Sequence, residues 1–234
     1  MADNYSFLIE KLDKFIRKYY VNKLLKGVLF TTAIILVFFL SIVLAENQFY
    51  FTPFVRKILF FGFILSAVSS FIGFVLKPIL QLNRLGNQIS HKQAADIIGV
   101  HFNKVQDKLL NVLQLKENTL SLQDASLIEA SIKQKSEELK PVPFTSAIDL
   151  QENSKYLKFV LPPLLLFIAL LFFRPSLIKD STNRLVQNNL AFEKPMPFYF
   201  EITNEDLRAI QFEDYKLNIL IIGEELPQEV FIVK

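Results

Sequence analysis

The residues of this chain best suited to acid–base or metal chemistry are two histidines and two pairs of adjacent glutamates. His91 and His101 lie ten residues apart with no carboxylate at ligand spacing, and the chain has no cysteine. Because a metal site needs three or four ligands, we expect none here. Adjacent side chains diverge on a helix or a strand, so the glutamate pairs are expected to be solvated rather than acid–base dyads; they are Glu137–Glu138 and Glu224–Glu225. No phosphate loop, nucleophile elbow or dinucleotide motif occurs, so the sequence predicts no enzyme, no cofactor and no small-molecule substrate.

One short segment could contact nucleic acid. Residues 93–110, QAADIIGVHFNKVQDKLL, resemble the helix-turn-helix of DNA-binding regulators, with Ala95, then Gly99 at the turn, then Val105 in a second helix. The side chains that would face DNA are His101, Asn103, Lys104 and Gln106. Lys108 stands at a core position of the motif, and two aspartates in the segment offset its lysines, which weakens phosphate binding. The composition favours an ordinary helix, glycine turn and helix, and DNA binding is the alternative.

The chain contains two long uncharged runs that predict membrane spans. Residues 27–45 and 58–76 are each nineteen residues long and carry no polar side chain beyond Ser and Thr. About 20 apolar residues cross the hydrocarbon of a bilayer, and a core helix of a soluble protein would show a polar face. The first run is longer than a signal-peptide core and is closely followed by the second, so we expect it to stay as an anchor.

A third span is expected over residues 158–178. Its uncharged part runs from Lys158 to Arg174 and holds fifteen residues, with Pro162 and Pro163 near the start. Proline is tolerated in the first turn of a helix, so the pair is interpreted as a helix start. Arg174 is expected to reach the far interface, which extends the span to about 20 residues.

The distribution of Lys and Arg predicts the orientation. Six basic residues precede the first span and two lie in the loop 46–57, whereas residues 77–158 carry eleven basic against nine acidic residues. The tail from residue 174 carries seven basic against ten acidic residues. The positive-inside tendency therefore places the N-terminus and the 82–157 insert in the cytoplasm and the tail outside. We expect a multi-pass membrane protein with its N-terminus in the cytoplasm and its C-terminus outside.

The remaining segments complete the expected organisation. Residues 1–26 form an amphipathic helix that either lies on anionic lipid, pairs with a partner helix or packs on the chain's own helices. The transmembrane hairpin covers 27–81, and its second span carries small residues that would let another helix approach closely; they are Gly62, Ser66, Ser69 and Gly73.

The soluble segments are expected to differ in kind. The insert 82–157 should hold helices over 91–99, capped by Ser90, and about 103–116 and 121–140, followed by an extended return to the membrane over 142–156. After the third span, a membrane-proximal helix is expected over 179–194. Strands are expected at 198–203, 215–222 and 229–234 within a β-rich segment, 195–234, that is too small to close a sandwich and so is expected to be incomplete.

A longer resemblance covers nearly the whole chain. Its residues are RLGNQISHKQAADIIGVHFNKVQDKLLNVLQL (84–115), VPFTSAIDL (142–150) and the run from PPLLLF to RPSLIKDSTNRL (162–185). In this order and spacing they resemble the N-terminal part of large, uncharacterised bacterial inner-membrane proteins of a domain-of-unknown-function family. The resemblance implies three transmembrane helices followed by immunoglobulin-like and helical extracytoplasmic segments, and it implies no catalytic residues.

Together these features predict an α-helical membrane protein with a small cytoplasmic helical bundle and a partial extracytoplasmic β-sandwich-like unit. Two soluble faces without a catalytic constellation predict a non-catalytic envelope scaffold in the lipid bilayer, with protein partners or self-association through its helices. The alternatives are a membrane-tethered DNA-binding regulator using residues 91–110, and a sensor that transmits a signal through the third span.

Overall fold

The structure of the chain, a computed structural model, describes residues 3–118, 125–192, 194, 196, 198–204, 207–208, 214–223, 227 and 229–231. The chain divides into two compact units, Met1–Asn189 and Leu190–Lys234. The first unit is helical and the second carries a small sheet.

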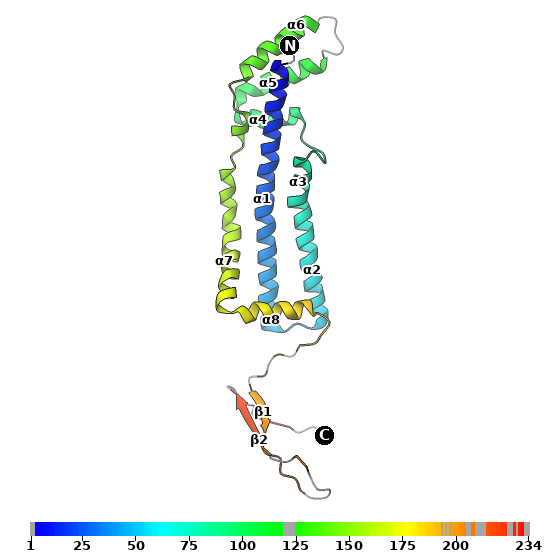
Figure 1. Ribbon diagram of the computed structural model, residues 1–234, viewed down its shortest axis with the longest axis vertical. Coiled ribbons are helices and arrows are strands. Elements are labelled where there is room, and N and C mark those ends of the chain that lie inside the picture. Colours follow the sequence, from blue (N-terminus) through cyan, green and yellow to red (C-terminus); the bar gives the residue numbers. More distant parts are fainter. Residues whose placement is uncertain are drawn as a thin grey trace. The chain divides into compact units, whose positions relative to one another are not determined.

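A single long helix organises the first unit. Helix α1 spans Asp3–Phe49, so the predicted juxtamembrane helix and first span are one continuous element. It lies between α7 on one side and α2 with α3 on the other (Figure 1). Among the described residues, three segments are long and apolar enough to cross a membrane: Asn4–Phe49, Pro53–Leu82 and Phe144–Phe173. The first two predicted spans fall within these segments, and the third begins within its segment but was expected to continue past Phe173 to residue 178.

The second span is one helical column with a local change of winding. Helix α2 (Pro53–Phe71) passes into a π-helical turn η1 (Ile72–Leu76) and then into α3 (Lys77–Leu82). Pro78 has no N–H, so the carbonyl of Phe74 four residues earlier loses its ordinary helical partner. At this point α1 contributes Gly27, where a Cβ atom would overlap the Phe74 carbonyl oxygen. The missing side chain lets the two backbones meet, with the Thr31 hydroxyl donating to the Ser70 carbonyl at 3.4 Å one turn further along α1.

The N-terminal half of α1 is built into a bundle with α4 (His91–His101), α5 (Asn103–Asn118) and α6 (Ala125–Leu139). The predicted amphipathic face of residues 1–26 therefore packs on the chain's own helices. The buried side chains of this core are Leu8, Leu12, Phe15, Ile16, Tyr20, Ala94, Ala95, Ile98, Val105, Leu109, Val112, Leu113, Ile132, Leu139, Phe144 and Ile148.

The local signals at the start of α4 are confirmed, but its predicted end is wrong. The Ser90 side chain accepts from the Gln93 amide at 3.1 Å and Gln93 Oε1 accepts from the Ser90 amide at 2.9 Å, a reciprocal capping box. Gly99 was expected at a turn, yet α4 continues to His101 and the break falls at Phe102. Gly99 instead leaves room for the side chain of Gln106, because a Cβ atom at position 99 would overlap that side chain.

The segment between α6 and the third span was expected to be extended, and this is wrong. It forms two 3₁₀ turns, η2 (Phe144–Ala147) and η3 (Gln151–Tyr156). Phe144 and Ile148 place their side chains in the bundle core, so the segment follows the surface of the bundle. The predicted start of the third bundle helix, residues 121–124, lies outside the described residues.

The third span and the helix after it differ from their predicted bounds. Helix α7 covers Leu157–Phe173, and Pro162 and Pro163 lie inside it rather than at its start. A helix in hydrocarbon continues through prolines because leaving the helix would expose more backbone groups. The chain turns at Arg174 and begins α8, Pro175–Val186, instead of extending the span to 178 and a helix to 194. In Figure 1, α8 runs across the ends of α1 and α2.

The second unit contains one antiparallel pair, β1 (Phe198–Ile202) and β2 (Ile219–Gly223). Phe200 pairs with Ile221, and the ladder runs from Phe198 opposite Gly223 to Ile202 opposite Ile219. Beyond the strands, Asn204 extends the pairing through side-chain bonds to the Lys216 carbonyl and the Asn218 amide. Residues 215–218 and 229–231 are not strands, and 232–234 lie outside the described residues. The described β-rich segment is thus a two-stranded sheet.

Candidate functional site

The most fully buried charged side chains lie at the α8 end of the spans. Glu46 near the end of α1 and Arg56 near the start of α2 are both 0 % exposed, and Arg184 of α8 is 8 % exposed. Glu46 Oε1 accepts from Arg56 Nε at 2.9 Å and from Arg184 Nε at 3.1 Å. One carboxylate thus joins three helices, and burial makes the loss of any member costly because the others would stay charged and desolvated.

Further contacts hold Arg184 in this position. Its Nη2 donates to the Ser181 hydroxyl at 3.1 Å, and its guanidinium lies 4.4 Å from the centroid of the Tyr50 ring. Tyr50 adopts a left-handed conformation, with φ of 48°, directly after α1. The other oxygen of Glu46, Oε2, accepts from the Phe51 amide at 3.3 Å, which fixes the loop between α1 and α2. A small apolar core lies beside the cluster, formed by Ile42, Val43, Ile178 and Leu185.

Sequence reasoning missed this cluster. The sequence places Glu46 and Arg56 in the short outer loop and Arg184 in the membrane-proximal helix, without linking them. Two sequence signals were available. Glu46 and Arg56 lie ten residues apart around a tight hairpin, and Arg184 lies three residues after Ser181 on an amphipathic helix. Nothing in the local pattern indicated that Arg184 would meet a residue 138 positions earlier in the chain.

At the opposite end of α1, Lys11 binds the bundle. Lys11 Nζ donates to the carbonyls of Leu139, Lys140 and Val142 at 3.3, 2.8 and 2.6 Å, just after α6 ends, and its ammonium lies 4.6 Å from the Phe144 ring. Carbonyls at a helix C-terminus lack helical partners, so a cation there is favourable. Burial lowers the pKa of Lys11.

A second set of contacts fastens the link between the second span and α4. The Tyr20 hydroxyl accepts from the Ile89 amide at 2.9 Å. Asp13 accepts from Arg84 at 3.1 Å, and its other oxygen lies 2.9 Å from His91 Nε2. Arg84 has a φ of 61°, so its turn is a strained backbone point that these contacts stabilise. The polar contacts of α1 therefore reach both the α3–α4 link and the segment after α6.

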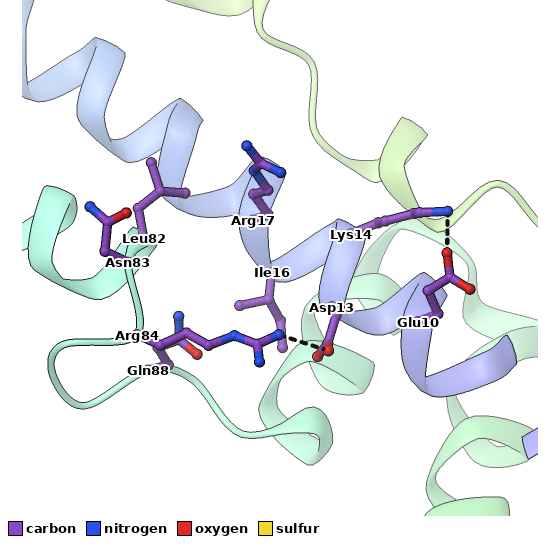
Figure 2. Close-up of a pocket in the computed structure, with 9 residues that line it drawn as sticks. All are labelled: Glu10, Asp13, Lys14, Ile16, Arg17, Leu82, Asn83, Arg84 and Gln88. Atoms are coloured by element: carbon purple, nitrogen blue, oxygen red, sulfur yellow. Dashed lines mark hydrogen bonds and ion pairs between the residues drawn. The ribbon is translucent and has the colours of Figure 1, made fainter. Parts of the chain in front are cut away.

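A pocket of about 500 Å³ lies beside these contacts (Figure 2). Four of its charged lining residues are already paired with each other: Lys14 with Glu10 at 2.7 Å, and Arg84 with Asp13. Figure 2 shows Arg17 and Lys14 pointing in different directions, so the cations do not converge on one point. The lining offers no set of groups that would surround one small molecule, so we assign no substrate to this pocket.

The predicted DNA-contacting residues lie around the α4–α5 junction. His101, Asn103 and Lys104 are exposed, whereas Gln106 is half-buried and donates to Asp96 at 3.2 Å. Ala95 and Val105 are in the bundle core, as the motif requires. Lys108 is exposed rather than in the core, and it pairs with Glu138 of α6 at 2.6 Å.

The small-residue face of the second span has no close neighbour at its glycines. A Cβ at Gly62 or at Gly73 would meet nothing within 4 Å. Ser66 is half-buried and Ser69 is exposed. The close approach between α1 and the second span occurs at Gly27 of α1 instead, a residue that was not among the predicted packing residues.

The histidines and glutamates of the sequence analysis are dispersed. His91 pairs with Asp13, and Glu137 Oε1 accepts from Asn4 at 3.0 Å. Glu224 and Glu225 lie outside the described residues. Among the residues that the structure describes, no group of three His, Asp or Glu side chains could hold a metal ion.

Comparison with models of known protein families, with curated proteins and with solved structures finds no match to this chain.

Proposed function

We propose that this protein is a non-catalytic scaffold of a bacterial inner membrane that connects a partner on the cytoplasmic side to one on the outer side. The observation that carries the proposal is the continuity of α1. Its 47 residues form one helix with a buried core at one end and the Glu46 cluster at the other. An element fixed at both ends transmits position across a bilayer better than a chain of flexible links.

The distribution of charge supports the orientation. The helical bundle carries the basic N-terminal segment and would lie in the cytoplasm, and the unit after α8 would lie outside. The resemblance over residues 84–115, 142–150 and 162–185 supports placing the chain with large bacterial inner-membrane proteins whose outer segments are immunoglobulin-like and helical.

The two-stranded sheet supports a partner on the outer side. A two-stranded sheet is marginally stable alone, and Tyr199, Phe200 and Leu220 are exposed on it. Such a sheet gains stability when another strand or layer covers it.

The test is cross-linking on each face of the membrane in cells, followed by purification and identification of the attached proteins. The proposal expects distinct proteins from the two faces. In the Glu46→Gln variant the two partners should no longer be recovered together. The Glu10→Gln variant, which removes only the exposed ion pair with Lys14, should still recover both. Recovery of lipid and of the protein itself alone would contradict the scaffold.

A sensor uses the same connection, and the bridging position of Glu46 favours it as a second candidate. Glu46 links α8, which leads into the outer unit, to α1, which leads into the bundle. If the protein transmits a signal, Glu46→Gln should change the proteins recovered on the cytoplasmic face while those on the outer face persist. If the protein is a static scaffold, Glu46→Gln should affect the recovery of proteins on both faces together.

The alternative, a DNA-binding regulator, predicts a different result. The full protein in detergent micelles should retard duplex DNA at low salt, and retardation should fall steeply as salt rises. The scaffold proposal expects no retardation. A shift that is lost in a Lys104→Gln variant would replace the scaffold with the regulator.

A further inference from the structure

Three lysines lie at the boundaries of the apolar spans, at the end where the helical bundle lies. Lys26 precedes the uncharged run of α1, Lys77 follows that of the second span, and Lys158 precedes that of α7. Gly27 against Phe74 and the Phe30 ring 5.0 Å from the Tyr156 ring bring these helices together at this level. Lysines at this boundary lie where the phosphate groups of a bilayer begin.

On the α7 side of α1, two of the ammonium groups at this level approach one aromatic ring. Lys26 Nζ of α1 lies 6.0 Å from the centroid of the Tyr156 ring, and Lys155 Nζ of η3 lies 5.5 Å from the same centroid. Asn153 donates to Asn22 Oδ1 at 2.7 Å, which holds η3 against α1. The backbone that carries Lys155 and Tyr156 is therefore fixed next to Lys26 of α1.

The positive charge at this junction is poorly compensated within the described part of the chain. Lys26 and Lys158 make no ion pair with the residues described, and Lys155 pairs with Glu152 at 3.5 Å on an exposed surface. An exposed pair of this kind contributes little. Two like charges beside one ring repel each other, and a bound anion would reduce that repulsion.

The surroundings favour a lipid as the source of the anion. Val28, Phe159 and Leu161 are exposed, and they begin within one turn of the lysines. A phosphate held by the lysines would place its acyl chains along these side chains. A soluble anion would leave this apolar surface uncovered.

We propose that the junction of α1, η3 and α7 binds the headgroup phosphate of an acidic phospholipid. Lys26 and Lys155 supply the charge, the Tyr156 hydroxyl donates a hydrogen bond, and Lys158 lies next to the bound headgroup at the start of α7. The exposed faces of α1 and α7 hold the acyl chains.

The test uses the full-length protein in nanodiscs with equal amounts of phosphatidylcholine and phosphatidylglycerol, followed by native mass spectrometry of the retained lipids. The wild type should retain phosphatidylglycerol preferentially. Lys26→Gln and Lys155→Gln should each lower that retention about fivefold, and Tyr156→Phe should lower it while keeping the ring.

Lys77→Gln is the matched control, since it removes one lysine charge from the start of α3, and α3 lies on the opposite side of α1 from α7 (Figure 1). It should leave retention unchanged. An equal loss of phosphatidylglycerol retention with Lys77→Gln would mean that diffuse surface charge causes the effect, and it would overturn the site. A wild type that retains both lipids equally would also overturn it.

Two further measurements guard the interpretation. The unfolding temperatures of the variants in lipid-free micelles should equal that of the wild type, and Lys158→Gln replaces any variant that fails this check. Inorganic phosphate added to lipid-free micelles should not raise the unfolding temperature, whereas phosphatidylglycerol should. Equal stabilisation by inorganic phosphate would mean a free-anion site and would overturn the assignment to lipid.

Discussion

Gly27 of α1 lies directly against the main-chain carbonyl of Phe74, at a point where any side chain would overlap that oxygen. Pro78 supplies no N–H four residues later, so this carbonyl lacks the partner it would have in an α-helix. The contact thus links a proline in one span to a glycine in another, and it sets how closely α1 and the second span pack.

We predict that Gly27→Ala separates α1 from η1 and lowers the stability of the protein. Forcing extra atoms into a close contact costs about 1 to 3 kcal/mol. Thermal unfolding in detergent should occur at a lower temperature than in the wild type. Gly62→Ala is the control, because a Cβ at Gly62 meets nothing within 4 Å, and it should leave the unfolding temperature unchanged or slightly higher.

The Glu46 cluster predicts a larger loss. In Glu46→Gln the two guanidinium groups of Arg56 and Arg184 stay buried without their shared carboxylate, and breaking a buried ion pair costs about 3 to 5 kcal/mol. We expect α8 to detach, which limited proteolysis between Phe173 and Gln187 would detect. If the Glu46→Gln variant resists protease as well as the wild type, α8 is held by its apolar face alone.

An acid-dependent effect is expected at the α5–α6 contact. The hydrogen bond and charge of Lys108 lower the pKa of Glu138 below its usual value. The carboxylate is therefore favoured in the folded state, so its contribution is present above the ordinary Glu pKa and is lost as pH falls through the lowered one.

Hydrogen exchange of the α6 amides measures this contribution. Lys108→Met should speed exchange at neutral pH, and the difference from the wild type should shrink in acid as Glu138 is protonated. Lys104→Met is the control, since Lys104 is exposed and makes no ion pair with the described residues. A difference that persists unchanged below the lowered pKa would show that Lys108 acts through packing.

The parts of this fold that the sequence predicts follow from solvent and local chemistry. Uncharged runs predict the three apolar helices because a bilayer imposes one length and one composition on them. Ser90 predicts the start of α4, because an N-cap side chain acts on backbone amides only two or three residues further on.

The remaining features depend on partners far away in the chain. Glu46 and Arg184 are 138 residues apart, so no local pattern links them. Pro162 and Pro163 indicated a helix start by the rules of soluble helices, yet the helix begins earlier, at Leu157. Arg174 fitted an interfacial boundary by type, but the turn there sends the chain into α8, whose place depends on the ends of α1 and α2.

The proposed orientation predicts that two introduced cysteines label from opposite sides of the membrane. The chain has no cysteine, so a single substitution gives a signal without background. Glu129 of α6 and Lys216 before β2 are both exposed, which makes Glu129→Cys and Lys216→Cys suitable positions. With a membrane-impermeant maleimide, the cysteine at position 216 should react in intact cells and the one at 129 only after permeabilisation. Both should react equally in denaturant, which controls for expression. Reaction of both in intact cells, or of neither, would mean that α7 does not cross the bilayer, and the bundle and the outer unit would then share one side.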